Sequence, residues 1–155
     1  MQETVLELKN YSVSFDTPDG EVQAVRNVDL TVKKGEITAV IGSSGSGKSL
    51  LAQAVMGILP EQAAAEGTIE FQGQELTKEY LRALRGREIA LIPQGVNGLD
   101  PLMRAGNQIR KGRKDLASFK RMEELLDRYG LPGETADKYP FELSGGMARR
   151  VLTAG

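Results

Sequence analysis

The most constraining feature of the chain is a glycine-rich octapeptide at residues 42–49, which reads Gly-Ser-Ser-Gly-Ser-Gly-Lys-Ser. It fits the pattern G-x-x-x-x-G-K-[ST] and lies between an apolar run at 37–41 and a helix-like stretch at 50–58. Successive backbone N–H groups of such a loop form a concave anion site, and the following helix adds partial positive charge. The Lys48 ammonium can reach outer phosphates and the Ser49 hydroxyl can hold Mg²⁺. A Gly/Ser linker is the alternative, but a linker has no reason to separate a buried strand from a helix.

Composition limits the remaining chemistry. The chain has 155 residues, of which 40% are hydrophobic and 26% charged, as in a globular domain with its own core. Its net charge is −1, so nothing in the charge balance calls for nucleic acid as a partner. Cysteine and histidine are both absent, which excludes disulfides, thiolate or imidazole metal ligands and a Ser-His-Asp relay within this sequence. We see neither a signal peptide nor an apolar run long enough to cross a membrane, so we expect any membrane role to come through a partner.

The hydrophobic pattern indicates a β-rich beginning, a phosphate-loop unit and a helical remainder. We expect strands at residues 5–15, 21–32, 37–41, 67–71 and 88–93, a turn at 17–20, and helices at 50–58, 78–85, 102–111, 118–129 and 148–154. The runs at 37–41 and 88–93 are apolar at most positions, as in parallel strands buried on both faces. Five residues of the helix at 118–129 fall on one face, which we interpret as a core-facing stripe: Phe119, Met122, Leu125, Leu126 and Tyr129. We interpret the basic cluster at 110–114 as a solvated loop.

Two further motifs offer ligands for phosphate or metal. Gln94 follows the predicted strand at 88–93, and its side-chain oxygen can bind Mg²⁺ or orient an attacking water. Ser144 is a natural N-cap for the following helix, and Gly145 and Gly146 expose N–H groups at its start. Each motif taken alone also has an ordinary interpretation, as a glutamine that ends a strand or as a capped turn.

Together, the three motifs resemble the nucleotide-binding subunit of ABC transporters. Residues 42–49 are similar to the Walker A loop, Gln94 to the Q-loop glutamine and residues 143–147 to the signature motif, in the family's order. Phe15 is similar to the aromatic residue that stacks on adenine. The resemblance covers the whole chain and implies an α/β fold of the P-loop NTPase type. It divides the chain into an antiparallel β subdomain (1–36), a P-loop core (37–94), a helical subdomain (95–143) and the start of the signature helix (144–155).

The local sequence narrows this resemblance to the ATPases of dipeptide, oligopeptide and nickel importers. The stretches that carry it are residues 15–20, 57–60, 99–104 and 139–147. The last of these slightly favours the nickel or metallophore branch. The transported solute stays open between peptides and nickel, because other subunits select it.

Within that family, two nucleotide-binding domains face head to tail and enclose ATP between the phosphate loop of one and the signature motif of the other. The resemblance therefore implies ATP and Mg²⁺ as cofactors, and a second ABC subunit and transmembrane permease subunits as partners. It also implies a peripheral position at the inner face of the cell membrane. The residues implied in cofactor binding are Phe15, Gly42, Ser43, Ser44, Gly45, Ser46, Gly47, Lys48, Ser49, Leu50, Gln94, Ser144, Gly145 and Gly146. Of these, Ser49 and Gln94 would hold the metal.

The chain departs from the family pattern after the signature motif. The family continues with a second buried strand that ends in the Walker B aspartate, then a glutamate that activates water and a switch histidine, whereas this sequence ends at Gly155. We therefore expect part of the core sheet to be missing, no catalytic residue in the chain and no turnover by the chain alone. Either the complete polypeptide hydrolyses ATP to power import, or the chain is a truncated, non-hydrolytic binding module. A DNA-repair type of ABC protein fits less well, because residues 94–144 leave no room for its coiled coil.

Overall fold

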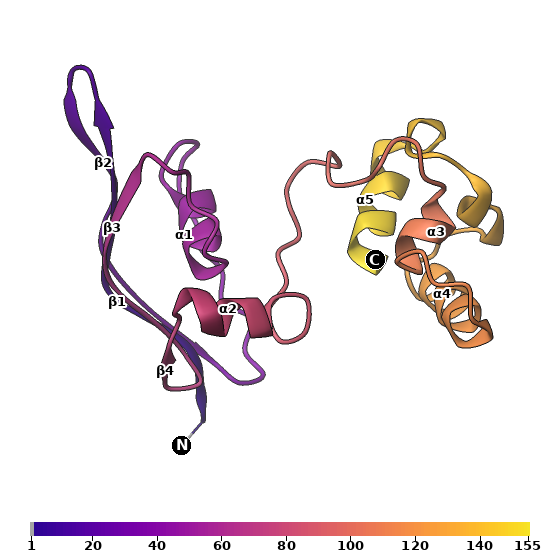
Figure 1. The fold of residues 1–155 in the computed structure, drawn as a ribbon, viewed down its shortest axis with the longest axis horizontal. Helices are drawn as coiled ribbons and strands as arrows, with labels where there is room; N and C mark the ends of the chain where they lie inside the picture. Colours follow the sequence, from indigo (N-terminus) through magenta and orange to yellow (C-terminus); the bar gives the residue numbers. More distant parts are fainter. Residues whose placement is uncertain (1) are drawn as a thin grey trace. The chain divides into compact units, whose positions relative to one another are not determined.

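The computed structural model describes residues 2–155, which form two compact units. The first unit ends at Leu91 and the second begins at Ile92. Among the described residues, the first unit carries all of the β-strands together with two α-helices, and the second is helical (Figure 1). The two units are described separately below.

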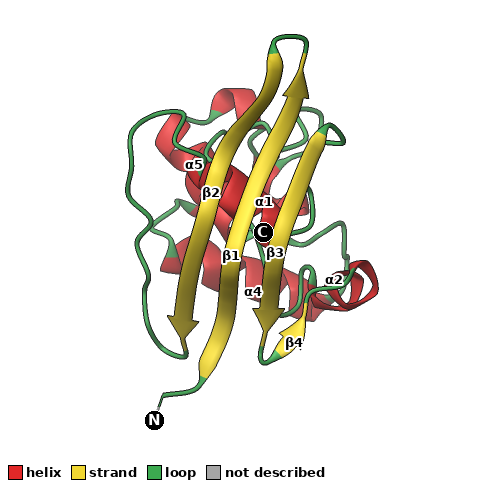
Figure 2. Cartoon of the chain, turned by 90° about the vertical axis from the view of Figure 1, so that its left-hand side faces the viewer, coloured by secondary structure: helices red, strands yellow, loops and turns green. Residues whose placement is uncertain are grey.

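The first unit is built on an antiparallel sheet with the strand order β2-β1-β3-β4 (Figure 2). The strands are β1 (Thr4–Thr17), β2 (Gly20–Lys33), β3 (Ala63–Phe71) and β4 (Gln74–Glu75). Strands β1 and β2 form a hairpin in which Thr17 pairs with Gly20, and Thr17 Oγ1 donates a hydrogen bond of 2.6 Å to the Gly20 carbonyl. The predicted N-terminal strands and the turn between them are therefore confirmed.

One face of this sheet packs against helix α1 (Lys48–Val55), as Figure 1 shows. The buried side chains of this core are Leu8, Tyr11, Val13, Val25, Ala54 and Ile69. Leu8 and Val13 differ in parity along β1 and would point to opposite faces of a regular strand. The register shifts between them, next to Asn10, whose φ is 48°, so both side chains face the core.

Helix α2 (Lys78–Leu84) follows the sheet, and its Leu81 lies close to Gly57, in the turn beyond α1. Thr77 accepts a hydrogen bond from the Tyr80 N–H and caps α2, as the sequence predicts. The Arg85 guanidinium donates to the Gly57 carbonyl over 3.0 Å, just beyond α1. The turn that follows α1 is therefore held to the end of α2 within the first unit.

The predicted strands at 37–41 and 88–93 are wrong for this structure. Neither segment is a strand, and the one bridge described there pairs Arg85 with Ile89. Ile37 is fully exposed and Ile41 is 92% exposed. An apolar run becomes a buried strand only when neighbouring strands accept its backbone hydrogen bonds and cover its faces. Among residues 2–155 no strand flanks either segment, so the parallel part of the core sheet is missing.

The second unit packs three α-helices and two short 3₁₀ helices around one core. They are α3 (Ala105–Ile109), α4 (Leu116–Arg128), η1 (Gly133–Asp137), η2 (Pro140–Glu142) and α5 (Gly145–Ala154). The buried core consists of Leu99, Ala105, Ile109, Met122, Leu126, Leu131, Ala148, Val151 and Ala154. No helix of the described residues is long and apolar enough to cross a membrane.

The predicted stripe on α4 is confirmed for most of its length and wrong at one end. Met122 and Leu126 are buried, and Leu125 and Tyr129 pack against the same core. Phe119 is 41% exposed, and the Arg110 guanidinium lies over its ring at 3.8 Å. An arginine from the basic cluster covers this aromatic side chain in place of the core, so the cluster is not solvated throughout.

Candidate functional site

The glycine-rich loop is shaped by two residues with left-handed backbone. Gly45 has a φ of 81° and Gly47 a φ of 84°, a region that other residues seldom adopt. Gly47 is also the N-cap of α1, and it offers no side chain to the free N–H groups of the first turn. Residues 45–50 line an open hollow of about 200 Å³ at this helix start. The loop thus presents unsatisfied donors to a space large enough for a phosphate group.

The loop backbone also packs closely on β2. A Cβ added to Gly47 would lie 2.7 Å from both the Ala24 carbonyl oxygen and Val25 Cγ2, closer than van der Waals contact allows. A Cβ at Gly42 would lie 2.5 Å from Ser46 Oγ. Gly47 is therefore required by its close approach to the sheet backbone, whereas a side chain at Gly42 would require the Ser46 hydroxyl to move.

The Lys48 ammonium lies inside the loop. It donates hydrogen bonds to the carbonyl oxygens of Gly42 at 2.8 Å and Ser43 at 2.6 Å, and to Ser46 Oγ at 3.1 Å. All three acceptors are uncharged, and Lys48 forms no ion pair with a carboxylate of residues 2–155. The ammonium is thus held beside the hollow with its positive charge uncompensated by a carboxylate. Ser49, the next residue of α1, is exposed.

Phe15 lies outside this hollow. It is half-buried on β1, where it pairs with Val22 and Ala63, and it packs against the first core. Val13, two residues earlier, pairs with Val25, on which Gly47 packs. Phe15 is therefore the next β1 side chain after Val13 on the face of the sheet against which the loop packs. Its predicted contact with adenine stays a prediction.

The second predicted anion site lies at the start of α5. Ser144 Oγ accepts a hydrogen bond of 3.3 Å from the Met147 N–H, so the predicted N-cap is confirmed. Gly145 and Gly146 are exposed, and a Cβ added to either would meet nothing within 4 Å. The backbone at this helix start is exposed, although one of its N–H donors, that of Met147, is already bound by Ser144.

Gln94 belongs to the second unit, together with α5. Its side chain is exposed, and its backbone carbonyl accepts a hydrogen bond from the Arg149 guanidinium of α5. Sequence reasoning missed Arg149, because the only available signal was a pair of adjacent arginines behind the signature residues. Ser49 and Gln94, the two predicted Mg²⁺ ligands, lie in different units, and their use of a common ion stays a prediction.

A sequence model described as "ABC transporter" matches residues 25–155. The chain belongs to the ABC transporter family. The dipeptide transport ATP-binding protein DppD of Lactococcus lactis subsp. cremoris is 38% identical to it, over 99% of this chain and 48% of that protein. The oligopeptide transport ATP-binding protein OppD of Bacillus subtilis is 39% identical, over 97% of this chain and 46% of that protein. This ABC chain thus spans about half the length of the curated relatives that it matches.

Solved structures agree with this assignment. The dimeric structure of MJ0796, a bacterial ABC transporter cassette, matches 96% of this chain and 67% of its own with a TM-score of 0.82 and 28% identity. A post-hydrolysis structure of the same cassette, bound to ADP and Pi, matches with a TM-score of 0.78 and 26% identity. The predicted α/β fold of the ABC type is confirmed, with the chain covering part of the cassette. The predicted resemblance to peptide-importer ATPases is confirmed as well.

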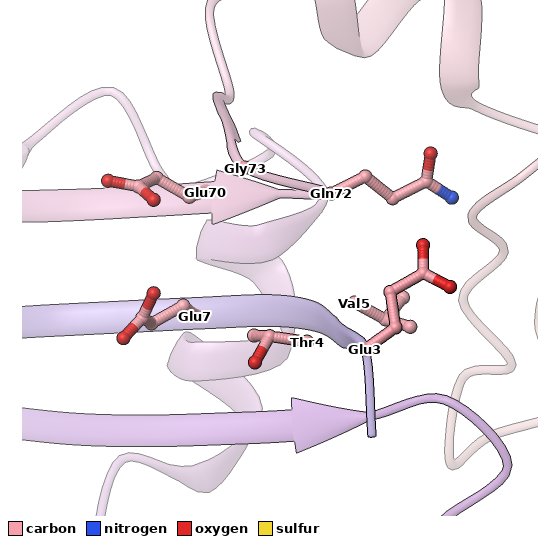
Figure 3. A pocket seen from close by; sticks show the side chains of 7 residues that line it. All are labelled: Glu3, Thr4, Val5, Glu7, Glu70, Gln72 and Gly73. Atoms are coloured by element: carbon pink, nitrogen blue, oxygen red, sulfur yellow. The ribbon is translucent and has the colours of Figure 1, made fainter. Parts of the chain in front are cut away.

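A second hollow of this ABC chain gathers carboxylates but is no metal site. About 250 Å³ in volume, it is lined by Glu3, Thr4, Val5, Glu7, Glu70, Gln72 and Gly73 (Figure 3). Lys9 Nζ lies 2.8 Å from Glu70 and 3.3 Å from Glu7, and Lys34 Nζ lies 2.9 Å from Glu3. The hydrogen bond to Glu70 raises the pKa of Lys9 above its ordinary value. In residues 2–155 no group of three or more His, Cys, Asp or Glu side chains could hold a metal.

Proposed function

We propose that this protein is the ATP-binding subunit of an ABC importer for peptides. The observation that carries the proposal is the hollow at the start of α1, with the Lys48 ammonium hydrogen-bonded to the loop beside it. Phosphate oxygens can replace the neutral acceptors of Lys48 and bring the negative charge that these acceptors lack. The relatives DppD and OppD are named as dipeptide and oligopeptide transport proteins, which supports peptides over nickel as the solute.

The nucleotide would be held mainly by the first unit. Residues 42–50 would bind the phosphates through their backbone N–H groups, and Ser49 and Gln94 would bind Mg²⁺. Phe15 would contact the adenine from the sheet. The exposed start of α5, with Ser144, Gly145 and Gly146, would complete the nucleotide site of a second ABC subunit. The dimeric state of the related cassette supports this arrangement.

Coupling to transport requires partners in the membrane. ATP bound between two ABC subunits would draw them together, and hydrolysis would release them. Permease subunits would convert this movement into a change between a state open to the outside and a state open to the inside of the cell. They would also hold the protein at the inner face of the cell membrane.

Hydrolysis itself needs groups beyond those around the loop. The residues that line the hollow, 45–50, include no carboxylate to serve as a general base, and the sequence matches none of the family's catalytic carboxylates. We therefore expect the 155-residue polypeptide to bind nucleotide without sustained turnover. Should it act only in this way, it would be a binding module, which is the alternative function. Steady phosphate release that depends on Lys48 would contradict this expectation.

Titration calorimetry with ATP tests the proposal. Lys48→Ala removes the ammonium beside the hollow and should weaken ATP binding by at least about tenfold, since a charge-assisted hydrogen bond to phosphate is lost. Lys34→Ala is the matched control, because it removes an exposed lysine that pairs with Glu3 away from the loop. Equal ATP affinity in the wild type and in Lys48→Ala would overturn the assignment of the site.

A further inference from the structure

The segment that contains Gln94 is anchored at both ends to helices of the second unit. We call residues 94–103 the Gln94 strap. At its start, the Gln94 carbonyl accepts a hydrogen bond from the Arg149 guanidinium. At its end, the Gln108 carboxamide of α3 accepts from the Asp100 N–H at 2.9 Å and donates to the carbonyls of Asp100 and Met103 at 3.0 and 2.7 Å. The strap has no regular secondary structure, so these side chains supply partners for its backbone beyond its two turn hydrogen bonds, Leu99 to Val96 and Met103 to Asp100.

Between the anchors, the strap packs on α5. Leu99 is buried in the same core as Val151 and Ala154. A Cβ added to Gly98 would lie 3.2 Å from Leu152 Cδ1, so the strap backbone runs close to this helix. Arg149 therefore adds a hydrogen bond to the packing of the strap on α5, and this bond holds the part of the strap that carries the candidate metal ligand.

The neighbouring arginine makes a different set of contacts. The Arg150 guanidinium donates to the carbonyls of Tyr129 at 3.2 Å, Gly130 at 2.9 Å and Gly146 at 3.3 Å. It thus binds the end of α4 and the first turn of α5, and all three of these hydrogen bonds go to residues outside the strap. The two arginines are adjacent and of the same type, so each is a matched control for the other.

We propose that Arg149 is a positioning residue that fixes Gln94 to α5, so that the candidate metal ligand and the glycine-bearing start of this helix move as one body. The carbonyl of Gln94 and its carboxamide belong to one residue, and holding the first restricts the directions open to the second. A guanidinium is suited to this role because it stays charged at all working pH values and donates in a fixed plane. The inference rests on the proposed function only for the role of Gln94 toward Mg²⁺.

Hydrogen–deuterium exchange of the 155-residue chain tests the contact itself. In Arg149→Gln, exchange within residues 95–99 should become at least about fivefold faster at Leu99, whose N–H donates to the Val96 carbonyl at 3.0 Å, because the guanidinium no longer holds the start of this segment. Arg149→Lys, which keeps a charged donor, should restore part of the protection. Arg150→Gln should instead speed exchange near Tyr129 and Gly130 and leave residues 95–99 unchanged. Unchanged exchange at 95–99 in Arg149→Gln, or an equal effect of Arg150→Gln there, would overturn the proposal.

The magnesium dependence of ATP binding tests the positioning role. We expect Mg²⁺ to tighten ATP binding by the wild type, and Arg149→Gln to reduce this gain by at least about threefold while the affinity without Mg²⁺ is kept. Arg150→Gln should keep the full gain. A wild type that does not bind Mg·ATP would refute the proposed function, and with it the positioning role. A wild type that binds, together with an unchanged magnesium gain in Arg149→Gln, would refute the positioning role alone.

Discussion

Two glycine-bearing helix starts in this chain solve the same problem in opposite ways. Every helix begins with N–H groups that have no partner within the helix. At α1 the N-cap is Gly47, which offers no side chain, and the lysine that follows folds back onto the carbonyls of the loop. At α5 the N-cap is Ser144, whose hydroxyl satisfies the Met147 N–H. The first start keeps its donors free, and the second uses part of its own.

The difference teaches which helix start can bind an anion by itself. At α1 the free donors, the ammonium and a hollow of about 200 Å³ coincide, an arrangement that favours an anion. At α5 the two exposed glycines leave room for an approaching phosphate, but no lysine is described there and one donor is taken. Under the proposed function, α1 would supply most of the binding energy for nucleotide, and α5 would contribute when a second subunit brings phosphate to it.

The largest expected effect is a loss of stability when a methyl group is added at the start of α1. Gly47→Ala places a Cβ 2.7 Å from the Ala24 carbonyl and forces alanine into positive φ. Both effects are unfavourable, and together they should lower the free energy of unfolding by about 2–4 kcal/mol. Urea denaturation followed by circular dichroism measures this loss, and ATP binding should fall with it.

Gly146→Ala is the matched control at the other helix start. Its Cβ meets nothing within 4 Å, and its φ lies outside the left-handed region. Alanine has the better helix propensity, so this variant should be neutral or more stable by up to about 1 kcal/mol. If both alanine variants changed stability by the same amount, the contrast between a packed loop and an open helix start would be refuted.

The sequence was a good guide wherever a local contact decides the structure. Ser144 and Thr77 each cap a helix as predicted, since a cap needs only a hydroxyl and a few following residues. The runs at 37–41 and 88–93 were predicted as strands from their apolar residues alone. A strand also needs neighbours, and local sequence carries no information about whether neighbours are present.

The same reasoning explains what was missed at the candidate site. Arg149 and Gln94 are 55 positions apart in the sequence, and no local pattern around either residue predicts their contact. Phe119 has the helical spacing of a core residue, yet Arg110 covers it from a loop that the pattern assigns to solvent. The loop at 42–49 could be found because its chemistry is contained in one continuous segment, whereas its packing on Val25 of β2 could not.

The next effect sharpens the contrast by removing the cap of α5. Ser144→Ala deletes the hydroxyl that binds the Met147 N–H and should lower the free energy of unfolding by about 1 kcal/mol. Ser144→Asn should recover most of this loss, because its side-chain oxygen can accept the same bond. The measurement is urea denaturation of the three proteins side by side. A Ser144→Ala variant as stable as the wild type would show that the hydroxyl does not cap α5 in solution.

The smallest effect concerns α4, which is capped by a group that can titrate. Asp115 accepts a hydrogen bond of 2.9 Å from the Ser118 N–H, and this bond lowers the pKa of the Asp115 carboxyl below 3.8. Because the pKa is depressed in the folded state, the cap stabilises the protein at pH values above the ordinary pKa. That stability is lost as the pH falls through the lower, folded-state value.

Asp115→Asn isolates this contribution, because asparagine caps a helix without titrating. Urea denaturation should be repeated at steps from about pH 6 down to about pH 2, a range that extends well below the ordinary pKa of aspartate, which is about 3.9. The wild type should lose more stability than Asp115→Asn across the acidic end of this range, and the two curves should run parallel above about pH 5. Other carboxylates, such as Glu134 beside Lys138, titrate alike in both proteins and cancel in the difference. Parallel curves over the whole range would mean that Asp115 does not cap α4 as an anion. The charged cap of α4 would then no longer stand as a third case beside the hydroxyl cap of α5 and the uncapped start of α1.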